Sequence, residues 1–239
     1  MADTPRSAVV FGARNLGRAV IEVLVAEGWA VAGVARSAET LAGVSAAGAL
    51  AVQADVTDRA SVREVLERAA AAHGSVDLVM NAASAYGGDR SGPFGGGPIA
   101  DAPPGAFDAW AAAPARSAFA FLSATGSFLL AQGTPATVIQ ATGGSARRAA
   151  AGRGLWAAGA FGVRAITQAA ALELREHGIH VALLIIDAGI QPLSDSGAVR
   201  PEAADPHELA AAVLFLANQG VRSATHELQV TPLAERWVP

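Results

Sequence analysis

Short β-type segments alternate with helical segments along the chain, and this alternation constrains the fold more than any other feature. Seven segments have the apolar character of buried strands: 7–13, 30–36, 49–55, 76–83, 136–143, 180–187 and 226–232. Helical spacing of apolar residues marks four segments, each ending at a glycine suited to a C-terminal cap: 16–28, 61–74, 158–178 and 205–220. Because parallel strands need crossover helices, the pattern predicts an α/β fold. We expect a doubly wound, mostly parallel, seven-stranded sheet with helices on both faces.

The chain reads as one domain over residues 1–239. Its 239 residues suit one large α/β domain, and neither a linker nor a repeat interrupts the pattern. The irregular segment is 86–105, whose Gly and Pro content is too high for the interior of an element. It follows the carboxyl end of a strand, where open α/β sheets bind ligands, so we expect a loop at a binding cleft.

Composition excludes several classes of function. The formal net charge is −4, the arginines are scattered, and we therefore expect no nucleic-acid partner. The chain has no apolar run long enough for a membrane span and no signal-peptide core, which predicts a cytoplasmic protein without a membrane partner. It also has no cysteine, so neither disulfides nor thiolate chemistry is available. We also expect no metal, since the histidines lack spaced partners: His73, His177, His180, His207 and His226.

The first strand, turn and helix carry a nucleotide-binding signal. Gly12 ends the strand and Gly17 opens the helix, an arrangement that lets backbone amides face a pyrophosphate. Arg36 ends the second strand, where an arginine suits the 2′-phosphate of NADP and an acid would suit NAD; Arg14 could reach the same phosphate. The pair favours NADP(H) over NAD(H). Alternatively, both are solvated turn arginines.

The order of motifs resembles the short-chain dehydrogenase/reductase family over nearly the whole chain, which implies a Rossmann-type fold. Asp55 and Val56 match the family's adenine contact, "NAA" at 81–83 matches its Asn-Ala-Gly motif, and "DAGI" at 187–190 matches its nicotinamide-side loop. The resemblance implies these cofactor-binding residues: Gly12, Arg14, Asn15, Leu16, Gly17, Arg36, Asp55, Val56, Asn81, Ala82, Ala83 and Ile190.

The glycine turn departs from the family pattern TGxxxGxG. In "FGARNLG", Phe11 replaces the threonine, the turn is one residue short, and Asn15 stands at the middle glycine. Because asparagine tolerates left-handed backbone, we expect Asn15 to substitute for that glycine conformationally. Ala83 adds a methyl group beside the cofactor in place of the motif's last glycine.

The family's catalytic positions are occupied by residues without acid/base chemistry. The resemblance places Pro114 at the asparagine, Gly143 at the serine, Trp156 at the tyrosine and Ala160 at the lysine. An indole has no usable acid/base equilibrium near neutrality, and the chain contains no lysine anywhere to lower the pKa of a tyrosine. The ordinary carbonyl–alcohol mechanism of the family therefore cannot run at these positions.

A few polar groups remain as candidates in the cleft. Tyr86, the only tyrosine, begins the Gly-rich loop and could reach a substrate, or it could pack on the domain. Thr142 and Ser145 flank the serine position and could hydrogen-bond a ligand carbonyl. Three arginines follow the fifth strand and form either an anion site or a solvated basic loop: Arg147, Arg148 and Arg153.

Three functions are compatible with this pattern. The first is a nucleotide-binding pseudoenzyme with a regulatory, binding or assembly role. The second is an NADP-dependent oxidoreductase that takes its proton from Tyr86 or water. The third is a cofactor-independent lyase, isomerase or cyclase that uses the emptied cleft on an unidentified small molecule.

Association with further subunits is also expected. The family forms dimers and tetramers through two helices that correspond here to 113–132 and the helix of Trp156. Both segments are rich in small apolar residues, which permit close helix packing. We expect a homodimer or homotetramer, or assembly with an active relative.

Overall fold

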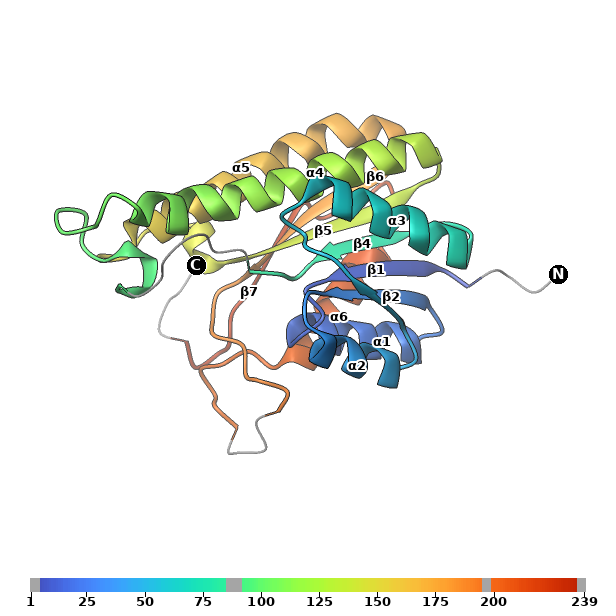
Figure 1. Ribbon diagram of the computed structural model, residues 1–239, viewed down its shortest axis with the longest axis horizontal. Helices are drawn as coiled ribbons and strands as arrows, with labels where there is room; N and C mark the ends of the chain where they lie inside the picture. The colour runs from blue at the N-terminus through green and yellow to red at the C-terminus, as the bar shows by residue number, and fades with distance from the viewer. Residues whose placement is uncertain (1–4, 85–91, 195–198, 236–239) are drawn as a thin grey trace.

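A parallel seven-stranded sheet forms the centre of the molecule (Figure 1). The computed structural model describes residues 5–84, 92–194 and 199–235. The strand order is β3-β2-β1-β4-β5-β6-β7, and every pairing in the sheet is parallel. The strands are β1 Ser7–Phe11, β2 Ala30–Ala35, β3 Leu50–Gln53, β4 Leu78–Asn81, β5 Ala136–Gly143, β6 Ile179–Ile186 and β7 Glu227–Val230. The predicted doubly wound α/β fold is confirmed.

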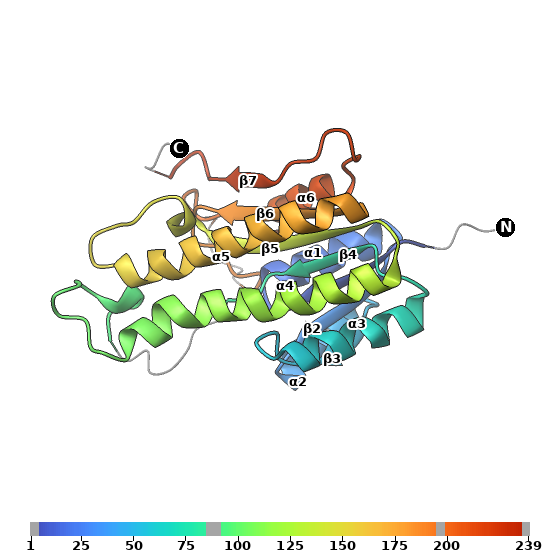
Figure 2. The same ribbon diagram turned by 90° about the horizontal axis from the view of Figure 1, so that it is seen from above.

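Helices cover both faces of this sheet (Figures 1 and 2). One layer contains α1 Leu16–Ala26, α2 Ala38–Ala46 and α6 Pro206–Ala217, and the other contains α3 Arg59–His73, α4 Ala113–Gln132 and α5 Gly154–Leu174. Short turns complete the described elements: η1 Phe94–Gly96, the π-helical η2 Asp108–Ala112, η3 Gly144–Ala146 and η4 Arg175–His177. In the described ranges, none of the helices has the length and apolar character needed to cross a membrane.

Alternating strand residues supply two separate cores. Val10 and Leu184 pack in the cluster that includes α1 and α6, whereas Val9 and Val181 pack in the cluster that includes α3, α4 and α5. Successive side chains of a strand point to opposite faces, so each strand contributes to both cores. This explains why the strand segments are apolar without interruption.

The strand order reverses at β1, which lies between β2 and β4. Ligands of open α/β sheets bind at such a reversal, beyond the carboxyl ends of the strands. The turn from β1 to α1 packs closely here: a Cβ on Gly12, whose φ is +84°, would lie 2.5 Å from the amide nitrogen of Ala83. A Cβ on Gly17 would lie 2.4 Å from the Gly12 carbonyl oxygen. These glycines are therefore required by the packing of the chain itself.

Some element boundaries differ from the sequence prediction. Helix α2 was not predicted, because only Val44 of its residues is buried; it begins at Ser37, whose side chain accepts a hydrogen bond from the Thr40 amide. Helix α5 begins at Gly154 rather than 158, since its first turn packs on the segment before α4. The predicted cap at Gly220 is wrong: α6 ends at Ala217, and the Asn218 amide closes its last turn on the Leu214 carbonyl.

The Gly- and Pro-rich segment 86–105 is only partly irregular. Its residues 86–91, including Tyr86, lie outside the described residues. Within the rest, η1 forms a short 3-10 turn at Phe94–Gly96. In Figure 1 the segment leading from η1 to α4 projects beyond the sheet at the end where α4 and α5 begin.

Candidate functional site

The crevice expected beyond the carboxyl ends of the strands has the start of α1 at its phosphate end. Asn15 is the N-cap residue, yet in the described chain its side chain makes no capping hydrogen bond to the helix. Its Oδ1 instead accepts a hydrogen bond from the Leu193 amide at 2.8 Å, and its Nδ2 donates to the Gln191 carbonyl at 3.2 Å. An asparagine at this position normally accepts a bond from the first turn. The first turn of α1 is thus left without a side-chain cap.

The predicted backbone role of Asn15 is wrong. Its φ is −109° and its ψ is −89°, so the residue does not adopt the left-handed conformation of the glycine it replaces. Among the described residues, only glycines have positive φ values. The side chain of Asn15 is directed across the crevice, and its amide is used in tertiary contacts.

The adenosine end carries an exposed ion pair. Nη1 of Arg36 lies 3.7 Å from Oδ2 of Asp55, and 78% of the arginine side chain is exposed. Asp55 also accepts hydrogen bonds from the amide and hydroxyl of Thr57 at 2.9 and 2.8 Å. Because an exposed ion pair contributes little stability, the Arg36 guanidinium can exchange this partner for a phosphate. Arg14 is exposed as well, whereas Val56 packs within the core.

Asn81 joins the ends of β4 and β5. Its side chain is buried; Nδ2 donates to Oε1 of Gln140 at 3.0 Å, and Oδ1 accepts from the Ala83 amide at 3.0 Å. The Ala82 amide in turn donates to the Phe11 carbonyl at 2.9 Å. This segment stabilises the floor of the crevice, and its contact with a cofactor stays a prediction.

An aromatic cluster surrounds the tyrosine position of the family. Trp156 packs edge-to-face on Phe94 and Trp110, with ring centroids 5.5 and 6.2 Å apart, and Phe94 and Trp110 are 5.0 Å apart. The three rings come from η1, η2 and the first turns of α5. Edge-to-face pairs of this kind stabilise packing beyond the area they bury. Trp156 therefore holds the segment before α4 against α5.

The asparagine position coincides with an irregular helical turn. Pro114 has no N–H to donate to the Trp110 carbonyl, and the turn before it is π-helical. Gly159 of α5 packs directly on this turn, because a Cβ there would lie 2.5 Å from the Trp110 carbonyl oxygen. Ala160, at the lysine position, is 3% exposed. The lysine position therefore holds a buried methyl group next to a closely packed glycine.

A buried carboxylate lies beside the serine position. Asp187 follows β6 and is 7% exposed, and its Oδ2 lies 2.6 Å from Nη1 of Arg148. Its carboxylate is packed so closely on Gly144 that a Cβ there would overlap it, whereas a Cβ on Gly143 would meet its nearest neighbour only at 3.9 Å. The sequence places Asp187 in the "DAGI" segment but does not predict its pairing with Arg148; an acid directly after the apolar run "VALLII" is the available signal.

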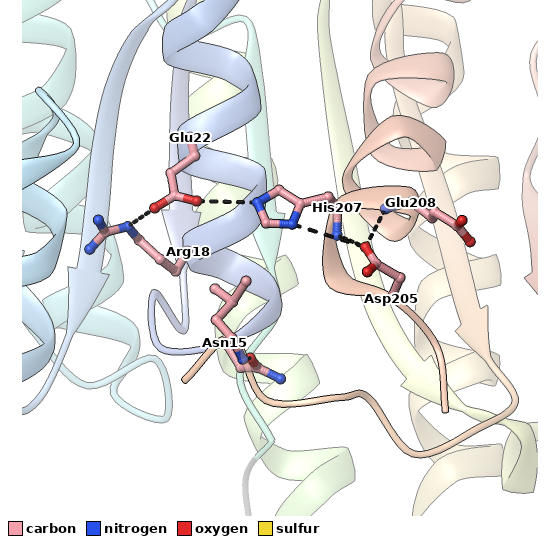
Figure 3. Close-up of polar contacts among 7 residues, drawn as sticks. Asn15, Arg18, Glu22, Asp205, His207 and Glu208 are labelled. Carbon is pink, nitrogen blue, oxygen red and sulfur yellow. Dashed lines mark hydrogen bonds and ion pairs between the residues drawn. The ribbon is translucent and has the colours of Figure 1, made fainter. Parts of the chain in front are cut away.

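The other candidates are not brought together. Thr142 and Ser145 are half-buried at the end of β5, Arg147 is exposed, and the guanidinium of Arg153 lies 5.5 Å from the Phe94 ring centroid. His207 contacts Glu22, which also binds Arg18 and so joins α6 to α1 (Figure 3). In the described part of the chain, no group of three His, Asp or Glu residues could hold a metal ion.

A histidine pair lies where β6 and β7 begin, away from the carboxyl ends of the strands. The rings of His180 and His226 are 5.8 Å apart, and Nε2 of His180 lies 3.0 Å from the Thr225 carbonyl oxygen. Burial lowers the pKa of His180, and the neighbouring His226 lowers it further against the opposing effect of the Thr225 carbonyl. Both rings are remote from the crevice, as expected from the sequence, because they precede or begin strands whose carboxyl ends form it.

Comparison with known proteins agrees with this geometry. The family model of the short chain dehydrogenases matches residues 6–190. The chain belongs to the short-chain dehydrogenase family. A sorbitol dehydrogenase of Cereibacter sphaeroides is 29% identical over 181 residues, which are 74% of this chain and 67% of that protein. A 3-oxoacyl-(acyl-carrier-protein) reductase of Salmonella typhimurium is 41% identical over only 85 residues, 34% of this chain and 35% of the reductase.

Solved structures of short-chain dehydrogenases superpose along the whole chain. A metagenomic short-chain oxidoreductase in complex with NADP is 26% identical, with a TM-score of 0.73 over 96% of this chain and 98% of its own. An alcohol dehydrogenase of Thermococcus sibiricus complexed with 5-hydroxy-NADP has a TM-score of 0.78 at 21% identity, covering 98% and 99% of the two chains. At that identity the second likeness concerns the fold alone.

The crevice of this short-chain dehydrogenase relative fits a dinucleotide unevenly. Arg36 suits the adenosine phosphate, and the first turn of α1, without a side-chain cap, suits a diphosphate. Asn15, however, bridges the start of α1 and the loop after β6. At the nicotinamide end, the tyrosine and lysine positions hold an aromatic cluster and a buried alanine.

Proposed function

We propose that this short-chain dehydrogenase relative binds NADP(H) and does not catalyse carbonyl–alcohol oxidoreduction. Its role is then that of a binding, regulatory or assembly protein. The observation that carries the proposal is the packing at Trp156 and Ala160, where the family's proton-transfer pair would stand. Bound NADPH would supply hydride, whereas Trp156 and Ala160, which stand at the tyrosine and lysine positions, supply neither an acid/base group nor a cation.

The absence of a proton-transfer pair is not compensated by another residue pair of the same kind. The sequence contains no lysine, and its single tyrosine is Tyr86. The polar pair at the serine position, Arg148 and Asp187, is an ion pair in which the carboxylate is already neutralised. A guanidinium stays protonated at all physiological pH values and is a poor proton donor. The protein would therefore bind the dinucleotide without catalysing carbonyl–alcohol oxidoreduction.

Preference for NADP(H) over NAD(H) rests on the adenosine end. Arg36 stands where a 2′-phosphate would lie, and its weak, exposed contact with Asp55 leaves it available. The NADP complex of the metagenomic relative supports the choice of cofactor class. A 2′-hydroxyl in the same place would bring no charge to Arg36.

We also propose that α4 and α5 form a contact with a second subunit. The two helices lie side by side on one face of the sheet (Figure 2). They expose large apolar side chains: Phe119 is 56%, Leu130 43%, Phe161 44% and Leu172 62% exposed. Apolar residues of this size on one face are typical of a subunit interface. The partner is a second copy of the chain or an active relative, which would suit a regulatory role.

The proposal is tested by titrating the protein with NADPH and NADH and assaying turnover over a panel of aldehydes and ketones. The expected result is saturable binding, tighter for NADPH, with no change in NADPH absorbance beyond the no-enzyme rate. An active short-chain dehydrogenase serves as the assay control. Turnover would refute the non-catalytic assignment, and absence of binding to both dinucleotides would refute the binding assignment.

A further inference from the structure

The contact made by Asn15 joins two segments that lie far apart in the sequence. Its side chain reaches from the start of α1 to the backbone of the loop after β6, with one bond donated to the Gln191 carbonyl and one accepted from the Leu193 amide. The start of α1 and the loop after β6, which form the two walls of the crevice, are therefore close enough for one asparagine side chain to bond to both. Figure 3 shows Asn15 at this end of α1, below the Arg18–Glu22–His207 contacts that join α1 and α6.

This bridge crosses the path that a dinucleotide must take. The diphosphate of such a ligand binds at the N-terminus of the first helix, and the ligand continues along the carboxyl edge of the sheet. That edge runs from the turn after β1 toward the ends of β5 and β6. The Asn15 side chain joins the start of α1, which would face the diphosphate, to the loop after β6.

Asn15 is not needed to position the loop that it contacts. The Gln191 amide donates to the Ala204 carbonyl at 3.0 Å, the Ala204 amide donates to the Gly189 carbonyl at 2.8 Å, and Ile190 forms a parallel bridge with Ala204. Ala204 immediately precedes α6, which is joined to α1 through His207 and Glu22. The loop is therefore anchored by its own backbone, and the Asn15 bridge is an additional contact.

The bridge is made instead of a helix cap. An N-cap asparagine ordinarily stabilises its own helix by accepting from the amides of the first turn. Here the same oxygen accepts from Leu193, and no side-chain cap is present in this described segment. The first-turn amides of α1 are therefore not used by the Asn15 side chain, and such amides suit an anion.

We propose that Asn15 is an autoinhibitory latch that closes the diphosphate site, and that a dinucleotide binds only after its bonds to Gln191 and Leu193 break. The inference rests on the proposed binding of NADP(H) and deepens it. In the closed state the Leu193 amide donates to Asn15, and Asn15 donates to the Gln191 carbonyl. In the open state the side chain turns away, and both the first turn of α1 and the Leu193 amide become available to phosphate oxygens. Dinucleotide affinity is thereby reduced by the fraction of molecules that are open.

The test compares NADPH dissociation constants of the wild-type protein, Asn15→Gly and Asn15→Ala, measured by fluorescence titration. Both substitutions remove the amide, and both should tighten binding about tenfold, as expected if about one molecule in ten is open. Asn218→Ala is the control, because it removes an asparagine side chain after α6 that bonds Arg6 and not the loop after β6, and it should leave affinity unchanged. Amide exchange of Leu193, followed by NMR without ligand, should be faster in both Asn15 variants than in the wild type.

The outcomes separate the latch from the proposed function. Unchanged or weaker NADPH binding in both Asn15 variants would overturn the latch while leaving NADP(H) binding intact. Tighter binding in both variants than in the wild type, together with faster Leu193 exchange, would support it. Absence of binding in all the proteins would refute the binding proposal, and the assigned role of the latch with it. Leu193 exchange that is equally fast in all of them would show that the contact is not formed in solution.

Discussion

The two ends of the crevice differ in what the chain has placed there. At the adenosine end, an exposed arginine pairs weakly with an exposed carboxylate, and the first helix lacks a side-chain cap. At the nicotinamide end, three aromatic rings, a π-helical turn and a buried ion pair fill the positions of the family's catalytic groups. The first end keeps polar groups that a ligand can recruit. The second is repacked, so the two ends of one fold differ in what they can offer a ligand.

The difference between the two ends is tested most directly at the lysine position. Ala160→Lys should lower the free energy of unfolding by about 3 kcal/mol, because an unpaired ammonium would enter closely packed space. Ala158→Lys, on the exposed side of the same helix, is the matched control and should have little effect. Urea denaturation measures both. If the two lysine variants were equally stable, the nicotinamide end would lack the family's lysine side chain but would still have space for it.

The buried ion pair gives the next largest effect. Arg148→Ala should destabilise the fold by about 2 kcal/mol, since it leaves the Asp187 carboxylate unpaired in a nearly buried position; partial exposure of the arginine reduces the loss below that of a fully buried pair. Its exposed neighbour provides the comparison: Arg147→Ala should change stability by less than about 0.5 kcal/mol. Thermal and urea unfolding would report the difference. Equal stability of the two variants would mean that Asp187 does not depend on Arg148.

At the adenosine end the expected change is in affinity rather than stability. Arg36→Ala should weaken NADPH binding about tenfold through loss of a charge-assisted phosphate contact, with a much smaller effect on NADH. Arg222→Ala, which removes an exposed arginine after α6, controls for the general loss of positive charge. Isothermal titration of both dinucleotides distinguishes these cases. An equal loss of affinity for NADPH and NADH would show that Arg36 attracts both dinucleotides by its charge and does not contact the 2′-phosphate.

The smallest effect arises away from both ends of the crevice. Burial lowers the pKa of His180 in the folded protein, so below about pH 6.5 the unfolded chain takes up a proton that the folded chain does not. Stability should therefore decrease as the pH falls from 7 to 5, by less than about 1 kcal/mol because the ring is only partly buried. His180→Gln should show a shallower dependence in unfolding experiments at both pH values. If stability depended on pH identically in the wild type and His180→Gln, His180 would not be the cause of the dependence.

The sequence predicted the sheet well because strand burial is a local signal. All seven strands fall within or next to the predicted segments, whereas their order in the sheet was not predicted. Helix α2 escaped prediction because it buries little of its surface. Its only strong signal is the cap at Ser37, which was overlooked.

The candidate site was predictable only where it depends on neighbours in the chain. Arg36 and Asp55 could be placed from the strands that precede them. The hydrogen bond between Asn15 and Leu193 joins residues 178 positions apart in the sequence, and neither residue type predicts that it will contact the other. The pairing of Arg148 with Asp187 likewise depends on how the ends of β5 and β6 come together. Such contacts follow from tertiary structure, which a single sequence does not encode in any local pattern.

Gly159 has a mechanical consequence for the molecule. Because α5 touches the π-helical turn through backbone atoms, the contact leaves no side-chain rotamers to absorb a displacement. The aromatic segment before α4 and the first turns of α5 must therefore move together. A molecule that pushed between Phe94 and Trp156 would tilt the same helices whose outer residues, Phe119 and Phe161, face solvent. Events in the crevice would then be transmitted to the surface where a second subunit is proposed to bind.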